Sequence, residues 1–133
     1  MESQREVSGY LLDTNILIAL INNTVDRLPR RIRDILANAD VVPFVSVVSP
    51  WEISIKYKSG KLQLKRPLAE IPELFGKNGL SLLPLTLDHA LEVAQPEPAT
   101  KDPFDRLLLA VCACEGLKLL TTDRHLAGHR LVY

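Results

Sequence analysis

The chain has 133 residues and a mass of 14.9 kDa, which is the size of a single domain. Apolar residues make up 47% of it, enough for a packed core without disulfide support, so the composition excludes an intrinsically disordered protein. Basic and acidic residues number 16 each, and a net charge of zero provides no overall field that would attract a polyanion.

The N-terminal segment 1–8 is polar, which excludes a signal peptide, and we expect a disordered leader or a cloning remnant there. Residues 9–133 are expected to form one domain. The first apolar stretch is short and is interrupted by Asp13 and Asn15, so it is not expected to span a membrane. We therefore expect a soluble, cytoplasmic protein with no membrane partner.

Residues 9–12 predict a short buried strand, after which the chain turns at 13–15 into the apolar helix ILIALI. Pro29 suits the first position of a second helix that runs to about residue 38. The β-branched run VVPFVSVV predicts another strand. The sequence SPWE then indicates a helix start, with Ser49 as N-cap, and Gly60 ends that helix.

The second half continues the alternation of helices and strands. A short helix is predicted after Pro72, followed by the strand candidate LSLLPL and by a helix, LDHALEVA, that Thr86 caps. Asp102-Pro103-Phe104-Asp105 opens a helix that ends near Gly116, KLLTTD predicts a strand, and HRLVY suggests a last short one. This alternation predicts a three-layer α/β fold with a mostly parallel central sheet flanked by helices on both faces.

The cysteines and histidines favour no metal site of the zinc type. Cys112 and Cys114 point to roughly opposite sides of one apolar helix, and we expect both to pack in the core. His89, His125 and His129 lack a zinc-ligand spacing and are expected at the surface or in helix caps. The sequence also has no glycine-rich phosphate loop and no nucleophile elbow.

Carboxylates stand where parallel strands end or helices begin, which is where functional groups gather in such sheets. Asp13 follows the first strand and Asp123 follows KLLTT; each could simply cap or turn the chain. Glu52 could be the second half of a capping box with Ser49. Asp102 and Asp105 could be an N-cap and a first-turn acid that the helix dipole favours.

Taken together, Asp13, Glu52, Asp105 and Asp123 predict one site. Two ionised carboxylates ~5 Å apart repel each other by roughly 3 kcal/mol at an effective dielectric constant near 20, so a group of four needs protons or cations to offset the repulsion. Hard oxygen ligands without cysteine or histidine suit Mg²⁺ or Mn²⁺. Such ions can activate water for phosphodiester hydrolysis.

Basic residues are concentrated in two short segments. A charge run can be a solvated helix face or a phosphate-contacting patch, and the sequence leaves both readings open. The possible RNA contacts are Arg27, Arg30, Arg31 and Arg33 in one cluster and Lys56, Lys58 and Lys61, with Lys65 and Arg66, in the other. Trp51, Phe104 and Tyr57 neighbour the acids, where either helix packing or base stacking could explain them.

Four ordered motifs, LLDTN, WEISIKYKSGKL, DPFDRLLLA and LLTTD, resemble the acidic motifs of PIN-domain endoribonucleases. The sequences of these motifs are most similar to those in the toxins of VapBC-type toxin–antitoxin modules, and the resemblance runs from about Tyr10 to the C-terminus. Such toxins often have a histidine and an arginine before DPFDR, where this chain has Thr100 and Lys101.

The resemblance implies a PIN-like fold and cleavage of RNA that leaves a 5′-phosphate, with Mg²⁺ or Mn²⁺ as the cofactor. It implies a homodimer and a cognate antitoxin whose C-terminal segment blocks the site. Carried over by position, Asp13, Glu52, Asp105 and Asp123 would be the metal-binding and catalytic residues, with Thr121, Asp102 and Asn15 as accessory groups.

Two alternatives belong to other classes. A haloacid-dehalogenase-like phosphatase also starts with an aspartate after the first strand, but it needs a second aspartate where this chain has Asn15. A catalytically inert PIN scaffold that binds a protein or RNA partner would need none of the four acids. A nuclease assay with metal and with EDTA separates these alternatives from a nuclease.

Overall fold

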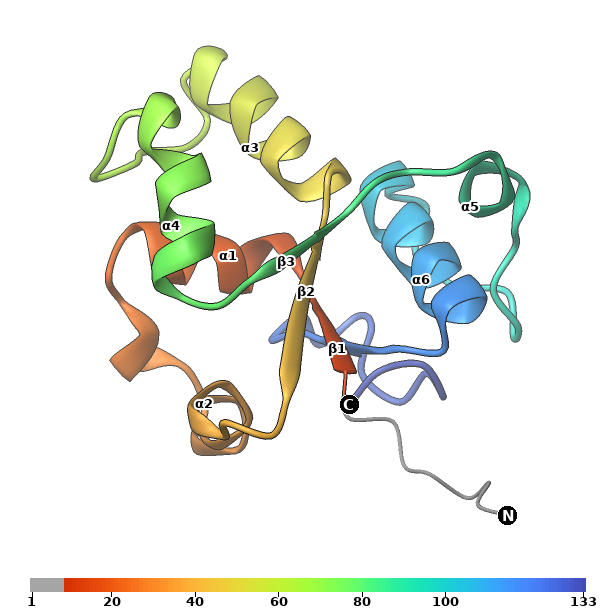
Figure 1. Ribbon diagram of the computed structural model, residues 1–133. Helices are drawn as coiled ribbons and strands as arrows, with labels where there is room; N and C mark the ends of the chain where they lie inside the picture. Colours follow the sequence, from red (N-terminus) through yellow and green to blue (C-terminus); the bar gives the residue numbers. More distant parts are fainter. Residues whose placement is uncertain (1–8) are drawn as a thin grey trace.

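A four-stranded, entirely parallel sheet with the order β3-β2-β1-β4 forms the centre of the molecule in the computed structural model, which describes residues 9–133 (Figure 1). The expectation of a disordered leader or remnant at 1–8 lies outside the described residues. The predicted α/β class with a mostly parallel sheet is confirmed. The strands are β1 (Gly9–Leu12), β2 (Val42–Ser46), β3 (Ser81–Leu83) and β4 (Lys118–Leu120).

Helices cover both faces of this sheet. In Figure 1, α1, α2 and α4 lie on one side of the strands, and α5 and α6 lie on the other. The helices are α1 (Thr14–Ile21), α2 (Arg30–Ala37), α3 (Val48–Lys58), α4 (Ile71–Lys77), α5 (Leu87–Leu91) and α6 (Pro103–Glu115), with single 3-10 turns at Val25–Arg27 and Leu68–Glu70.

The alternation of side chains along the strands divides the core in two. On β1, Leu11 packs under α6 and Leu12 packs under α1, and both are fully buried. On β4, Leu119 and Leu120 divide in the same way. Gly9 brings β1 very close to its neighbours, since a Cβ there would lie 2.9 Å from side-chain atoms of Phe44 and Leu117.

Helix α3 begins two residues earlier than the sequence predicted, at Val48 instead of Pro50. It starts at Val48, whose N–H donates to the Ser46 hydroxyl, so Ser46 rather than Ser49 receives a backbone donor at the helix start. The predicted capping box of Ser49 and Glu52 is therefore wrong. The helix reaches both halves of the core, because Val48 packs under α6 and Ile53 packs under α1.

Smaller predictions were also corrected. Pro29 precedes α2 as its N-cap residue, and HRLVY forms only an isolated bridge between Leu119 and Val132. Cys112 is buried as expected, but Cys114 is exposed because it lies on the solvent side of the last turn of α6.

The helix-cap prediction holds for His89, which completes a capping box with Thr86 and is buried rather than on the surface. In the described part of the chain, no helix is long and apolar enough to cross a bilayer.

Candidate metal centre at the carboxyl end of the sheet

Asp13 lies where the neighbouring parallel strands β1 and β4 end. It follows β1 directly, and its backbone N–H donates to the carbonyl of Leu120 at the end of β4 (2.9 Å). One carboxylate oxygen accepts the N–H of Thr14 at the start of α1 (2.8 Å), and the other accepts the hydroxyl of Thr121 (2.6 Å). Asp13 is thus both a helix cap and a buried carboxylate with a fixed orientation.

The environment of Asp13 disfavours its charge. Burial raises the pKa of Asp13 above its ordinary value, the hydrogen bonds from Thr121 and Thr14 lower it, and the nearby charges of Glu52 and Asp123 raise it again. Since two other carboxylates act on Asp13, the structure brings acids from three separate motifs within electrostatic range of one another.

Glu52 reaches the same region from α3. Its side chain is nearly buried, and one oxygen accepts the hydroxyl of Thr14 (2.7 Å) while the other lies 2.5 Å from the Lys56 ammonium. The hydroxyl of Ser49 lies 3.0 Å from that of Thr14. Thr14 therefore links the two acids: it donates its N–H to Asp13 and its hydroxyl to Glu52, which lies 38 residues further along the chain. We did not predict this link, although the adjacency of Thr14 to Asp13 was the available signal.

Thr121 makes a similar link on the other side of Asp13. It is buried, donates to Asp13, and accepts the backbone N–H of Asp123 (2.9 Å). One oxygen of Asp123 accepts the N–H of His125 (2.9 Å) and lies 3.2 Å from its imidazole Nδ1. The structure therefore places Thr121 beside Asp13 and Asp123, and its role as a polar accessory group stays a prediction.

Asp105 lies in the first turn of α6, which Asp102 caps by accepting the N–H groups of Phe104 and Asp105 (2.8 and 3.3 Å). Burial, and then the charges of Asp102, Asp13, Asp123 and Glu52, raise the pKa of Asp105 to about 7. Within residues 9–133, no donor makes a hydrogen bond to the Asp105 carboxylate. It is the acid of this group whose charge has the least compensation.

No three acidic, histidine or cysteine side chains of the described residues lie close enough to hold one metal ion between them as they stand. Mutual repulsion favours rotamers that keep like charges apart. The chemistry of the donors nevertheless fits a hard divalent cation, because the group consists of carboxylates with neighbouring hydroxyls. The raised pKa of Asp105, which comes first from burial and then from the neighbouring acids, shows that the ionised carboxylate is disfavoured without a counter-charge.

Of the other residues that the sequence singled out, some lie near this centre and some lie away from it. Trp51 of α3 is 59% exposed, and its ring meets that of Phe104 of α6 edge-on at 5.6 Å, so helix packing accounts for only part of its surface. Asn15 is exposed and makes no hydrogen bond to the acids in the described chain.

The arginine cluster lies on and just before α2, which Figure 1 places at the opposite end of β2 from α3. Arg31 has a structural contact there: it donates to the carbonyl of Tyr133 (3.1 Å) and lies over the Tyr133 ring (5.6 Å). Lys56 and Lys58 occupy the last turns of α3, on the same helix as Glu52.

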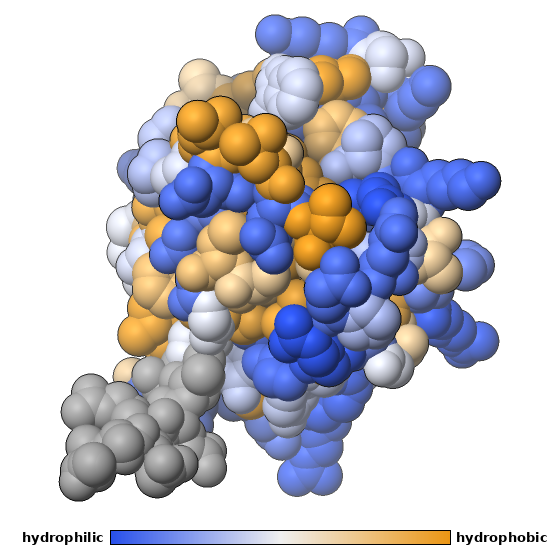
Figure 2. All heavy atoms as spheres, turned by 90° about the vertical axis from the view of Figure 1, so that its right-hand side faces the viewer, coloured by the Kyte–Doolittle hydropathy of each residue, from blue (hydrophilic) through white to orange (hydrophobic). Residues whose placement is uncertain are grey.

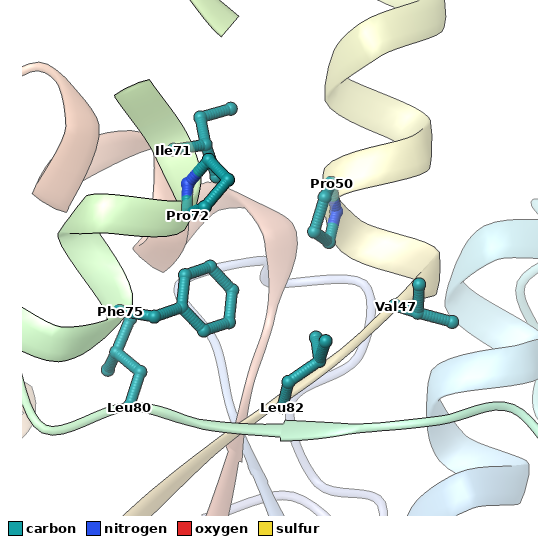
Figure 3. A pocket seen from close by; sticks show the side chains of 7 residues that line it. All are labelled: Val47, Pro50, Ile71, Pro72, Phe75, Leu80 and Leu82. Atoms are coloured by element: carbon teal, nitrogen blue, oxygen red, sulfur yellow. The ribbon is translucent and has the colours of Figure 1, made fainter. Parts of the chain in front are cut away.

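An apolar pocket lies between α3 and α4, and none of the four acids lines it. Figure 3 shows its side chains converging from the start of α3, from α4, and from the segment that leads through β3. Its volume is about 410 Å³. The lining residues are Val47, Pro50, Ile71, Pro72, Phe75, Leu80 and Leu82.

The opposite side of the molecule, which carries α5 and α6, also exposes apolar residues. Figure 2 shows hydrophobic patches there among hydrophilic side chains. Leu87 and Leu91, one turn apart on α5, are 73% and 71% exposed. Isolated exposed leucines are common, but an adjacent pair on one helix face is suited to a protein contact.

Comparison with known proteins links this geometry to one family. The family model described as "PIN domain" matches residues 10–130. A toxin–antitoxin complex from Klebsiella pneumoniae is similar in structure, with a TM-score of 0.58 and 23% identity over 93% of this chain and 95% of that one. VapBC2 from Rickettsia felis, bound to a DNA fragment from its promoter, has a TM-score of 0.53 and 16% identity over 86% and 88%. No curated protein sequence matches the chain.

Proposed function

The chain belongs to the PIN domain family, and on this premise we propose that it is a divalent-metal-dependent endoribonuclease that acts as the toxin of a toxin–antitoxin pair. The observation that carries the proposal is the linkage of acids from separate motifs: Thr14 joins Asp13 to Glu52, and Thr121 joins Asp13 to Asp123. The partly buried carboxylate of Asp105 lies within electrostatic range of all three.

The residues that would hold Mg²⁺ or Mn²⁺ are Asp13, Glu52, Asp105 and Asp123. When bound, such a cation supplies the charge that activates water and stabilises the leaving oxygen of a phosphodiester. The protein contributes orientation: the hydroxyls of Thr14 and Thr121 and the start of α1 fix two of the carboxylates before any ligand arrives. Donors fixed in advance do not have to be reorganised during the reaction.

A cleavage assay on a structured, end-labelled RNA tests the proposal. We expect cleavage with Mg²⁺ or Mn²⁺, none with EDTA, and products that carry a 5′-phosphate. Asp105→Asn, purified in parallel, should lose the activity and thereby exclude a contaminating nuclease. Undiminished cleavage in EDTA, or cyclic-phosphate products, would contradict metal-dependent hydrolysis. The inert-scaffold alternative is favoured if neither cleavage nor an effect of metal on the melting temperature is found.

We also propose that a cognate antitoxin covers the centre, since the two similar structures are a toxin–antitoxin complex and VapBC2 bound to promoter DNA. The apolar pocket offers a docking surface for this partner, because its lining includes Val47, the N-cap residue of α3, and Pro50 in the first turn of that helix, which also carries Glu52. Co-expression with the product of the neighbouring gene tests the idea. Leu82→Asp should weaken the complex, whereas Val93→Asp, an exposed position beyond α5, should leave it intact. Equal binding by both variants would place the partner elsewhere.

The homodimer is a further proposal, and the exposed pair Leu87 and Leu91 offers a surface for it. Sedimentation of the wild type and of Leu87→Ser/Leu91→Ser gives the test. A wild type that is monomeric at high concentration would exclude the dimer. A dimer that persists unchanged in the variant would move the interface away from α5.

A further inference from the structure

Lys56 makes an ion pair that differs from an ordinary surface pair on a helix. It lies four residues after Glu52 on α3, and its ammonium is 2.5 Å from the Glu52 carboxylate, whose side chain is only 8% exposed. By comparison, Arg30 and Asp34 on α2 have the same spacing but lie 3.9 Å apart, with 86% and 71% of their side chains exposed. Exposed pairs of that kind contribute little to stability, whereas removing one partner of a pair whose other member is nearly buried leaves an uncompensated charge and costs more.

Both oxygens of Glu52 already have a donor. Thr14 donates its hydroxyl to one, and Lys56 donates to the other. A hydroxyl is neutral and can remain beside a bound cation, but an ammonium repels a divalent ion at the same oxygen. The same oxygen of Glu52 can therefore accept the Lys56 ammonium or bind a metal ion, but it cannot do both at once.

The charge of Lys56 acts on more than one acid. Its pKa is raised by the hydrogen bond to Glu52, and the charges of Asp102 and Asp105 raise it as well. Among residues 9–133, no other lysine or arginine forms an ion pair with any of the four acids of the candidate centre. Lys56 is thus positioned to supply part of the positive charge that this group of carboxylates requires.

We propose that Lys56 is an internal counter-ion of the acidic centre, which holds Glu52 in place and competes with the divalent cation for it. The inference rests on the proposed metal-dependent function. It assigns Lys56 a positioning role, in contrast to the free RNA contact expected from its place in the basic cluster. Loss of Lys56 should therefore have two opposite effects: a less stable metal-free protein and tighter metal binding.

Lys56→Met tests both effects, because methionine keeps the length of the side chain but removes its charge and its donors. We expect the melting temperature in EDTA to fall by roughly 2–5 °C. In calorimetric titration, the Mn²⁺ dissociation constant should decrease about 3- to 10-fold, as expected when one competing charge is removed. Lys56→Arg keeps the charge and should behave like the wild type. Lys58→Met, on the same helix but exposed, is the matched control and should change neither quantity.

A purely structural role for Lys56 predicts weaker metal binding in Lys56→Met, because the site would be disordered, so the direction of the change decides. An unchanged or weaker affinity, or an unchanged metal-free melting temperature, would overturn the proposal. In a Glu52→Gln background, Lys56→Met should have almost no further effect on metal-free melting. If no variant binds Mn²⁺, the proposed function fails together with the competition, and the metal-free melting still decides whether Lys56 is a counter-ion.

Discussion

Replacing Asp105 with asparagine should make the metal-free protein more stable at neutral and alkaline pH. The folded-state pKa of about 7 lies above the ordinary aspartate value of 3.8. The folded protein therefore retains a proton that the unfolded chain releases between about pH 4 and pH 7, and the free energy of unfolding falls as the pH rises through this window. Asparagine has no such proton and should remove that part of the fall.

The size of the effect follows from the same two values. A gap of roughly three pH units corresponds to about 4 kcal/mol if it is expressed in full. Asp105 is only partly buried, and solvent screening should reduce this to about 2 kcal/mol. For a domain of this size, that amounts to a gain of roughly 5–10 °C in melting temperature at pH 8, with little gain at pH 4.

Thermal unfolding of wild type and Asp105→Asn in EDTA from pH 4 to pH 8 measures this difference. Asp88→Asn, which removes an exposed acid from α5, is the control and should follow the wild-type profile. Parallel pH profiles for wild type and Asp105→Asn would refute the reasoning, because they would mean that Asp105 ionises as freely in the folded protein as in the unfolded chain.

Further predictions concern the surroundings of the centre, the sheet and the basic surface. Thr121→Val leaves a buried oxygen of Asp13 without its donor, so urea unfolding should show a loss of about 1–3 kcal/mol, and Thr121→Ser should restore most of it. Gly9→Ala forces a Cβ into contacts of 2.9 Å and should cost about 1–3 kcal/mol; an unchanged urea midpoint would mean that the neighbouring side chains move aside easily. Lys58→Gln/Lys61→Gln should weaken RNA binding and make its salt dependence shallower, and identical salt slopes would leave these residues as a solvated face.

The sequence was most informative where several start and stop signals agreed on one element. The helix from Asp102 to Gly116 was predicted closely, because an N-cap acid, a proline at the first helical position and a C-terminal glycine all agree there. The parallel sheet followed from the alternation of strands and helices. The start of α3 was missed because a proline is tolerated throughout the first turn of a helix, so SPWE did not fix which residue comes first.

The composition of the candidate centre was accessible from the sequence, but its connections were not. That Asp13 and Asp105 would approach each other followed from their places at the edge of a parallel sheet. The bond from Thr14 to Glu52 crosses 38 residues and depends on how α1 and α3 pack, which no local pattern encodes. The spacing of four residues between Glu52 and Lys56 was visible, but spacing alone could not show that the glutamate would be nearly buried.

Helix α3 belongs to both halves of the core, with Val48 in one and Ile53 in the other, and Glu52 lies between them. Local unfolding of either half of the core would remove the packing contacts at one end of this helix. The backbone amides around Glu52 should therefore exchange with deuterium at the rate of global unfolding, more slowly than those of the short helix α5, which packs mainly against α6. The acid that α3 carries keeps its geometry for as long as the whole domain remains folded.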